Sequence, residues 1–124
     1  MWKKIALTTV LTMAFGTTDI MANTAQMAKL ASQQEILSHK VVLSYRKHDN
    51  AKLLAALHTL ESGHMKLRSG THNAEINNLL VFLDLCLNDL KKTVQKPYSA
   101  QNAQHVADLS DSLSEGNRYI EQSF

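Results

Sequence analysis

The sequence predicts an all-α protein: an antiparallel up-down-up-down four-helix bundle that follows an N-terminal signal peptide. The 124 residues include one Pro, four Gly and 6% aromatic residues, a composition that favours long helices over a turn-rich β fold. Apolar residues recur at three- and four-residue steps in four segments, which is the spacing of one helix face. Short polar breaks separate these segments, and short connections make neighbouring helices antiparallel.

The N-terminal segment has the order of a secretory signal peptide. Two lysines in "MWKK" precede an apolar run of 12 residues from Ile5 to Gly16, and small residues follow. This order predicts a signal peptide at 1–22 that is cleaved after Ala22, leaving a single domain at 23–124. The apolar run is too short to span a bilayer comfortably as a helix. We therefore expect a periplasmic protein without a stable membrane anchor, and retention of the segment as an anchor is the alternative.

The first two helices are expected at 24–48 and 51–68. Between them, "HDN" at 48–50 supplies Asp49 or Asn50 as the N-cap of the second helix. The apolar spacing predicts two inward faces: Met27, Leu30, Leu37, Val41 and Val42 in the first helix, and Leu53, Leu54, Leu57, Leu60 and Leu67 in the second.

The third and fourth helices are expected at about 74–95 and 100–122. Thr71 or Asn73 can cap the third helix, Pro97 ends it, and Ser99 can cap the fourth. The predicted inward faces are Ile76, Leu79, Leu80, Leu83, Leu87, Leu90 and Val94 in the third helix, and Val106, Leu109, Leu113, Ile120 and Phe124 in the fourth.

Charge and cysteine content limit the classes of function. The net charge is +2, and the basic residues are spread along the chain. Nucleic-acid binding needs a concentrated basic surface, so we expect no nucleic-acid partner. The single Cys86 cannot form an internal disulfide. Its apolar surroundings predict a buried core thiol, and an intermolecular disulfide is the alternative.

No pattern in the chain points to an enzyme, a cofactor or a metal. The sequence contains neither a Gly-x-Ser-x-Gly elbow nor a Gly-rich phosphate loop, and we predict no catalytic residue. His58 and His64 are six residues apart, and the pair Glu61 and His64 has no second pair to mirror it. Glu35 and His39, four residues apart, are expected to form an exposed ion pair.

The first helix contains a polar cluster that a simple core helix does not need. The stretch "LASQQEILSHKV", from Leu30 to Val41, resembles the first-helix motif of the PilJ-type domain. This domain is the N-terminal sensor domain of type IV pilus methyl-accepting chemotaxis transducers and is related to the sensor domain of NarX/NarQ-type nitrate kinases. The layout of the later helices is similar as well. The positions that match the motif are Ala31, Gln34, Leu37 and Ser38.

The departures from the motif change the expected ligand. Ser32 replaces a Gly, Ile36 a Met and Lys40 the final Arg, while Glu35 stands where the nitrate sensors have an Arg that faces the anion. An ionised carboxylate repels an anion, so we expect no nitrate binding. The candidate ligand-binding residues are Glu35, Ser38, His39 and Lys40. Together they would suit a zwitterionic or cationic ligand, or the basic side chain of a partner.

The resemblance implies a periplasmic sensor-like bundle without its own signalling domain. It would bind a small ligand or a periplasmic or inner-membrane signalling protein, with a homodimer through the first helix as one arrangement. A structural or chaperone-like bundle that binds client proteins is the alternative. For the polar cluster at 33–40, the sequence leaves two interpretations: a ligand site or a solvated helix face.

Overall fold

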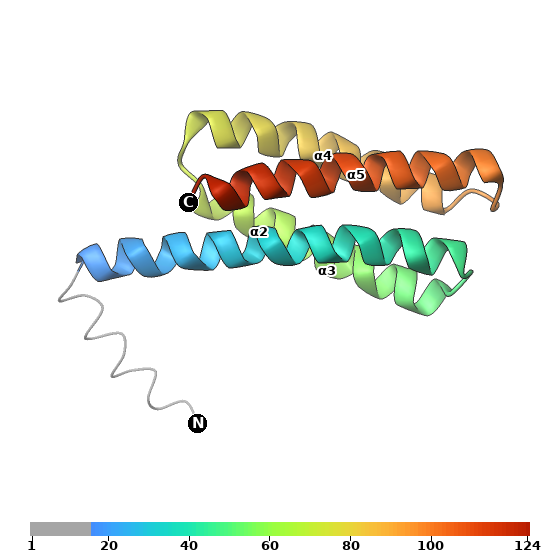
Figure 1. Ribbon diagram of the computed structural model, residues 1–124, viewed down its shortest axis with the longest axis horizontal. Coiled ribbons are helices and arrows are strands. Elements are labelled where there is room, and N and C mark those ends of the chain that lie inside the picture. Colours follow the sequence, from blue (N-terminus) through green and yellow to red (C-terminus); the bar gives the residue numbers. More distant parts are fainter. Residues whose placement is uncertain (1–15) are drawn as a thin grey trace, which may run out of the picture.

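A computed structural model describes residues 16–124, with side chains from Thr24 onward. Its helices are α2 (Gly16–Arg46), α3 (Asn50–Gly70), α4 (Ala74–Val94) and α5 (Ala100–Gln122), and this part of the chain contains no strand. The helices run alternately in opposite directions (Figure 1). Each helix packs against two neighbours, in the cyclic order α2, α3, α4, α5. The predicted all-α four-helix bundle is therefore confirmed.

The predicted signal peptide falls mainly on residues 1–15, which lie outside the described residues. The backbone of residues 16–22 is helical and continues into the rest of α2. Cleavage after Ala22 therefore stays a prediction. Among the described helices, none is both long and apolar enough to cross a membrane.

Side chains cap three of the helices at the predicted residues. Asp49, Asn73 and Ser99 each accept a hydrogen bond from a backbone N–H three residues later, over 3.0 to 3.1 Å. Such caps satisfy donors that a helix N-terminus leaves without intrahelical partners. His48, in the turn between α2 and α3, has a positive φ of 58°. A left-handed residue at this place reverses the chain direction within three residues.

Apolar side chains from all four helices form one core, and the predicted inward residues are buried or half-buried with one exception. Leu83 is fully buried in α4, and Cys86 is a buried free thiol. Burial raises the pKa of the Cys86 thiol, and Asp89 raises it further. The exception is Leu54, whose side chain is 64% exposed. Adjacent helical residues point about 100° apart, and Leu53 occupies the inward direction instead.

Two glycines allow side chains of neighbouring helices to approach closely. A Cβ at Gly63 of α3 would overlap the side-chain amide of Gln34 on α2, and a Cβ at Gly116 of α5 would lie 2.6 Å from Leu83 Cδ2. Both positions therefore belong to helix contacts.

Aromatic rings close one end of the bundle. The Tyr98 ring lies 5.3 Å from the Tyr45 ring and 4.6 Å from the His48 imidazole, measured between centroids. Tyr98 belongs to the connection between α4 and α5, whereas His48 belongs to the turn between α2 and α3. The contact therefore joins the two loops at this end, which is the right-hand end in Figure 1.

Candidate functional site

The four candidate residues of the first helix do not form one cluster in the structure. Glu35, Ser38 and His39 face α5, whereas Lys40 lines a groove between α2 and α3. The polar cluster is therefore divided between two sides of α2.

Ser38 is fully buried, and its polar atoms are bonded within the protein. Its hydroxyl donates to the Gln34 carbonyl oxygen over 2.8 Å, and its own carbonyl oxygen accepts from the Ser110 hydroxyl of α5 over 2.7 Å. A hydroxyl that reaches a neighbouring backbone requires the two helices to lie close together. In this arrangement Ser38 packs α2 against α5 and presents no free group to a ligand.

Glu35 and His39 have partners on α5 as well. Arg118 Nε donates to Glu35 Oε1 over 3.3 Å, and His39 Nε2 lies 3.4 Å from Ser114 Oγ. The prediction of an ion pair between Glu35 and His39 is therefore wrong, because α5 supplies a cation that the sequence pattern of one helix cannot reveal. A side-chain hydrogen bond with Glu35 also raises the pKa of the Glu121 carboxyl.

Gln34 connects α2 to α3, a role that sequence reasoning missed. Its Nε2 donates to the Leu60 carbonyl oxygen over 2.8 Å, while its buried Oε1 has no hydrogen-bond partner. The amide fits against Gly63, where there is no Cβ. The signal that could have revealed this contact is a glycine within the apolar repeat of α3.

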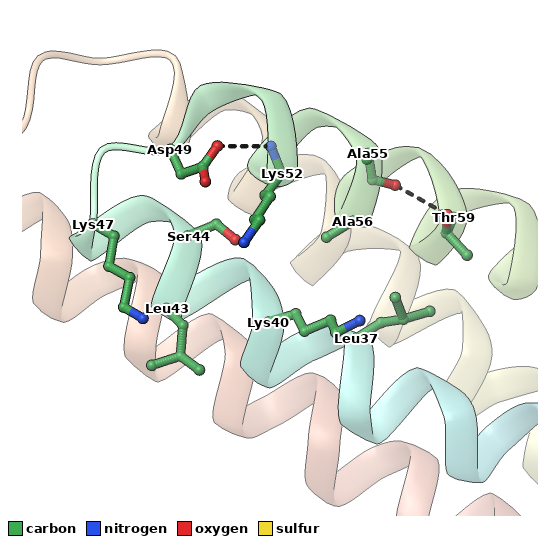
Figure 2. Close-up of a pocket in the computed structure, with 10 residues that line it drawn as sticks. All are labelled: Leu37, Lys40, Leu43, Ser44, Lys47, Asp49, Lys52, Ala55, Ala56 and Thr59. Atoms are coloured by element: carbon green, nitrogen blue, oxygen red, sulfur yellow. Dashed lines mark hydrogen bonds between the residues drawn. The ribbon is translucent and has the colours of Figure 1, made fainter.

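A groove with a volume of about 440 Å³ lies between α2 and α3 (Figure 2). Apolar and small side chains line its middle, and three lysines lie around it: Lys40 and Lys47 from α2 and Lys52 from α3. We call this surface the lysine groove. Its lining residues are Leu37, Lys40, Leu43, Ser44, Lys47, Asp49, Lys52, Ala55, Ala56 and Thr59.

The lysine groove has an excess of positive charge. None of the three ammonium groups has an ion pair or hydrogen bond with another residue from Thr24 onward. The only acid in the lining, Asp49, accepts the Lys52 backbone N–H as the N-cap of α3. The positive end of the α3 dipole also lies here. These groups give the lysine groove the donors and the charge that an anion needs.

Of the predicted candidates, only Lys40 belongs to the lysine groove; Lys47, Lys52 and Asp49 were missed. A sequence signal for the exposed surface existed. Gln33, Ile36, Lys40, Leu43 and Lys47 follow at alternating steps of three and four residues, which places them on one face of α2. All five are exposed. Helical spacing therefore identifies residues that share the outer face of α2, just as it identifies residues that share the inward face.

Charged side chains connect α3 to α4. His64 is buried, and its Nε2 lies 3.3 Å from Asp84 Oδ1; Arg68 lies 4.0 Å from the other oxygen of Asp84. Burial lowers the pKa of His64, and the Asp84 charge partly opposes this effect. Lys91 of α4 forms an ion pair with Glu61 of α3. Within residues 24–124, no group of three or more His, Cys, Asp or Glu side chains is arranged to hold a metal ion.

The outward face of α4 exposes apolar side chains. Val81, Phe82 and Leu85 have exposed fractions of 47%, 52% and 63%. Their spacing of one, three and four residues puts them on the same side of the helix. This surface could also contact another molecule.

In comparison with known proteins, no protein-family model, no curated protein and no solved structure matches this chain. The resemblance of residues 30–41 to the PilJ-type motif therefore stays a prediction that rests on those residues.

Proposed function

We propose that this chain is an exported, non-enzymatic binding bundle of the PilJ-like sensor type, and that it recognises an anionic group of a ligand or partner at the lysine groove. The observation that carries this proposal is the presence of three ammonium groups without partners around a concave, partly apolar surface of α2 and α3. The basic start and apolar run of residues 1–22 support export. The motif at 30–41 supports the sensor type.

The proposal moves the binding site from the sequence-predicted cluster to the other side of α2. Glu35 and Ser38 are bonded to α5, so a ligand would have to break these contacts. Lys40 and its neighbours in the lysine groove need no such rearrangement. A ligand with a negative charge therefore replaces the zwitterionic or cationic ligand that Glu35 suggested.

A titration followed by amide NMR tests this proposal. Sulfate, nitrate and a short dicarboxylate are added separately to the labelled protein. We expect chemical-shift changes at Lys40, Lys47 and Lys52, and none around Lys92, an exposed lysine of α4 that serves as the control. The absence of changes in the lysine groove with all three anions would contradict the proposal.

One observation favours the alternative of a chaperone-like bundle. Val81, Phe82 and Leu85 form an exposed apolar stripe on α4, and such stripes contact the apolar segments of other proteins. If the stripe binds unfolded clients, the protein delays aggregation of a reduced client, and Phe82→Ser with Leu85→Ser removes the delay. Equal protection by the double variant would argue against this alternative.

A further inference from the structure

The lysine groove is long compared with a small anion. Its α2 wall extends from Leu37 to Lys47 and its α3 wall from Asp49 to Thr59. At a rise of 1.5 Å per residue, each wall is about 15 Å long. An anion the size of nitrate would touch one lysine and leave most of the surface uncovered. An elongated occupant uses the whole groove.

The middle of the groove suits the apolar face of a helix. Ala55 and Ala56 of α3 are small, so another backbone can approach them closely. On the α2 side, Leu43 is 55% exposed and Leu37 is half-buried beside it. Covering such side chains with apolar surface removes them from water. Grooves of this composition bind amphipathic helices through apolar side chains at three- and four-residue steps.

The lysines add a charge pattern to this apolar surface. Lys40 and Lys47 are seven residues apart, or about 10.5 Å along α2. Acidic residues seven apart on a partner helix have the same spacing. Lys52 extends from the opposite wall toward Ser44 (Figure 2), so a bound helix would meet positive charge from both walls. Charge complementarity of this kind directs both partner choice and orientation.

From these three features we propose that the lysine groove binds an amphipathic helix of a partner protein, with an apolar stripe flanked by acidic residues. The inference rests on the proposed function and adds the class of partner. A flat anionic membrane surface fits the charge but cannot reach the buried Ala56 of the α3 wall.

Fluorescence anisotropy with synthetic helices tests the inference. One peptide of about 18 residues carries Leu at helical spacing and Glu at positions seven apart beside the Leu stripe. Its matched control carries Gln at the Glu positions. We expect the acidic peptide to bind at least about tenfold more tightly than the neutral one. Its binding should weaken in about 0.5 M NaCl because salt screens exposed charges.

Two sets of variants locate the binding. Lys40→Gln with Lys47→Gln should weaken binding of the acidic peptide about fivefold to twentyfold, since each exposed charge pair contributes modestly to the affinity. Lys66→Gln with Lys92→Gln removes the same charge elsewhere and should leave affinity within about twofold. Ala55→Phe fills the middle of the groove without changing its charge. It should abolish peptide binding while the sulfate shifts at the lysines remain. Circular dichroism confirms that each variant is folded.

Several outcomes would overturn the inference. One is equal affinity for the acidic and the neutral peptide, and another is an equal loss of peptide affinity in the two double lysine variants. The others are full peptide binding by Ala55→Phe, and binding of the protein to anionic phosphatidylglycerol vesicles without binding to the peptide. If small anions shift the groove amides but the peptide does not bind, the partner class is wrong and the proposed function stands. If neither binds, both are wrong.

Discussion

The α2–α5 and α3–α4 interfaces join their helices by different means. Between α2 and α5, the buried polar contact uses a small residue, because the hydroxyl of Ser110 donates to the backbone of Ser38, and the ion pair of Arg118 with Glu35 adds to it. Between α3 and α4, the polar contacts use longer side chains: His64 and Arg68 with Asp84, and Lys91 with Glu61. The α2–α5 contact is also the most extensive of the four and the α3–α4 contact the least.

The difference shows how side-chain size sets the separation that two helices can adopt. Small residues let the two backbones approach closely. The helices are then stabilised by close packing and by short hydrogen bonds inside the protein. Long charged residues bridge a wider separation, and their ion pairs remain partly in water, where they contribute little. We therefore expect the buried serine contact between α2 and α5 to respond to side-chain volume, and the contacts of His64 and Lys91 between α3 and α4 to respond to pH and charge.

The largest effect is expected from Ser110→Leu. The added volume would meet the backbone of Ser38, and the hydrogen bond would be lost, so we expect a loss of about 2–4 kcal/mol in unfolding free energy. Urea denaturation measures it. Ser62→Leu, at an exposed position of α3, is the control and should change stability by less than about 0.5 kcal/mol. Equal effects of the two variants would show that volume is not limiting between α2 and α5.

A smaller, pH-dependent effect is expected at His64. Burial lowers its pKa in the folded protein below the ordinary value near 6.5. As the pH falls below 6.5, the unfolded chain binds the proton first, and stability decreases until the folded-state pKa is reached. His64→Gln should therefore lose less stability than the parent protein between about pH 7 and about pH 5.

Denaturation at a series of pH values measures this difference. His72→Gln, which removes an exposed histidine, is the matched control. If stability falls with pH equally steeply in His64→Gln and in the parent protein, the folded protein accommodates the charged imidazole, and Asp84 compensates for its burial.

The smallest effect is expected from Glu61→Gln. The side chains of Glu61 and Lys91 are both more than one third exposed, at 35% and 39%, so solvent screens their attraction. We expect a loss of about 0.2–1 kcal/mol, smaller in high salt. Thermal melting at two salt concentrations measures the change. A loss well above this range would show that the α3–α4 interface depends on this ion pair more than its exposure indicates.

The sequence predicted the helices and most of the core because these depend on local patterns. Cap residues and apolar spacing act within one helix, and Asp49, Asn73 and Ser99 all cap as expected. The error at Leu54 arose where two adjacent leucines competed for one inward direction. Local spacing does not decide which of the two is buried, because that choice depends on the neighbouring helix.

The candidate site was only partly predictable, since it depends on contacts between distant segments. Glu35 and Arg118 are 83 residues apart, and Ser38 and Ser110 are 72 apart. No pattern within α2 shows that α5 would use these polar groups. Lys40 was identified, but the lysine groove also needs Lys52 from α3. The exposed spacing of Lys40, Leu43 and Lys47 carried part of the signal.

The buried thiol of Cys86 makes this protein its own reporter of opening motions. As the only cysteine in the sequence, it gives a single site for an alkylating reagent. Its side chain is enclosed in the core, and its raised pKa keeps the less reactive protonated form dominant at neutral pH. The rate of alkylation in native buffer therefore measures how often α4 separates from its neighbours. Without an engineered cysteine, variants of the α3–α4 interface can be compared by how far they accelerate that one reaction.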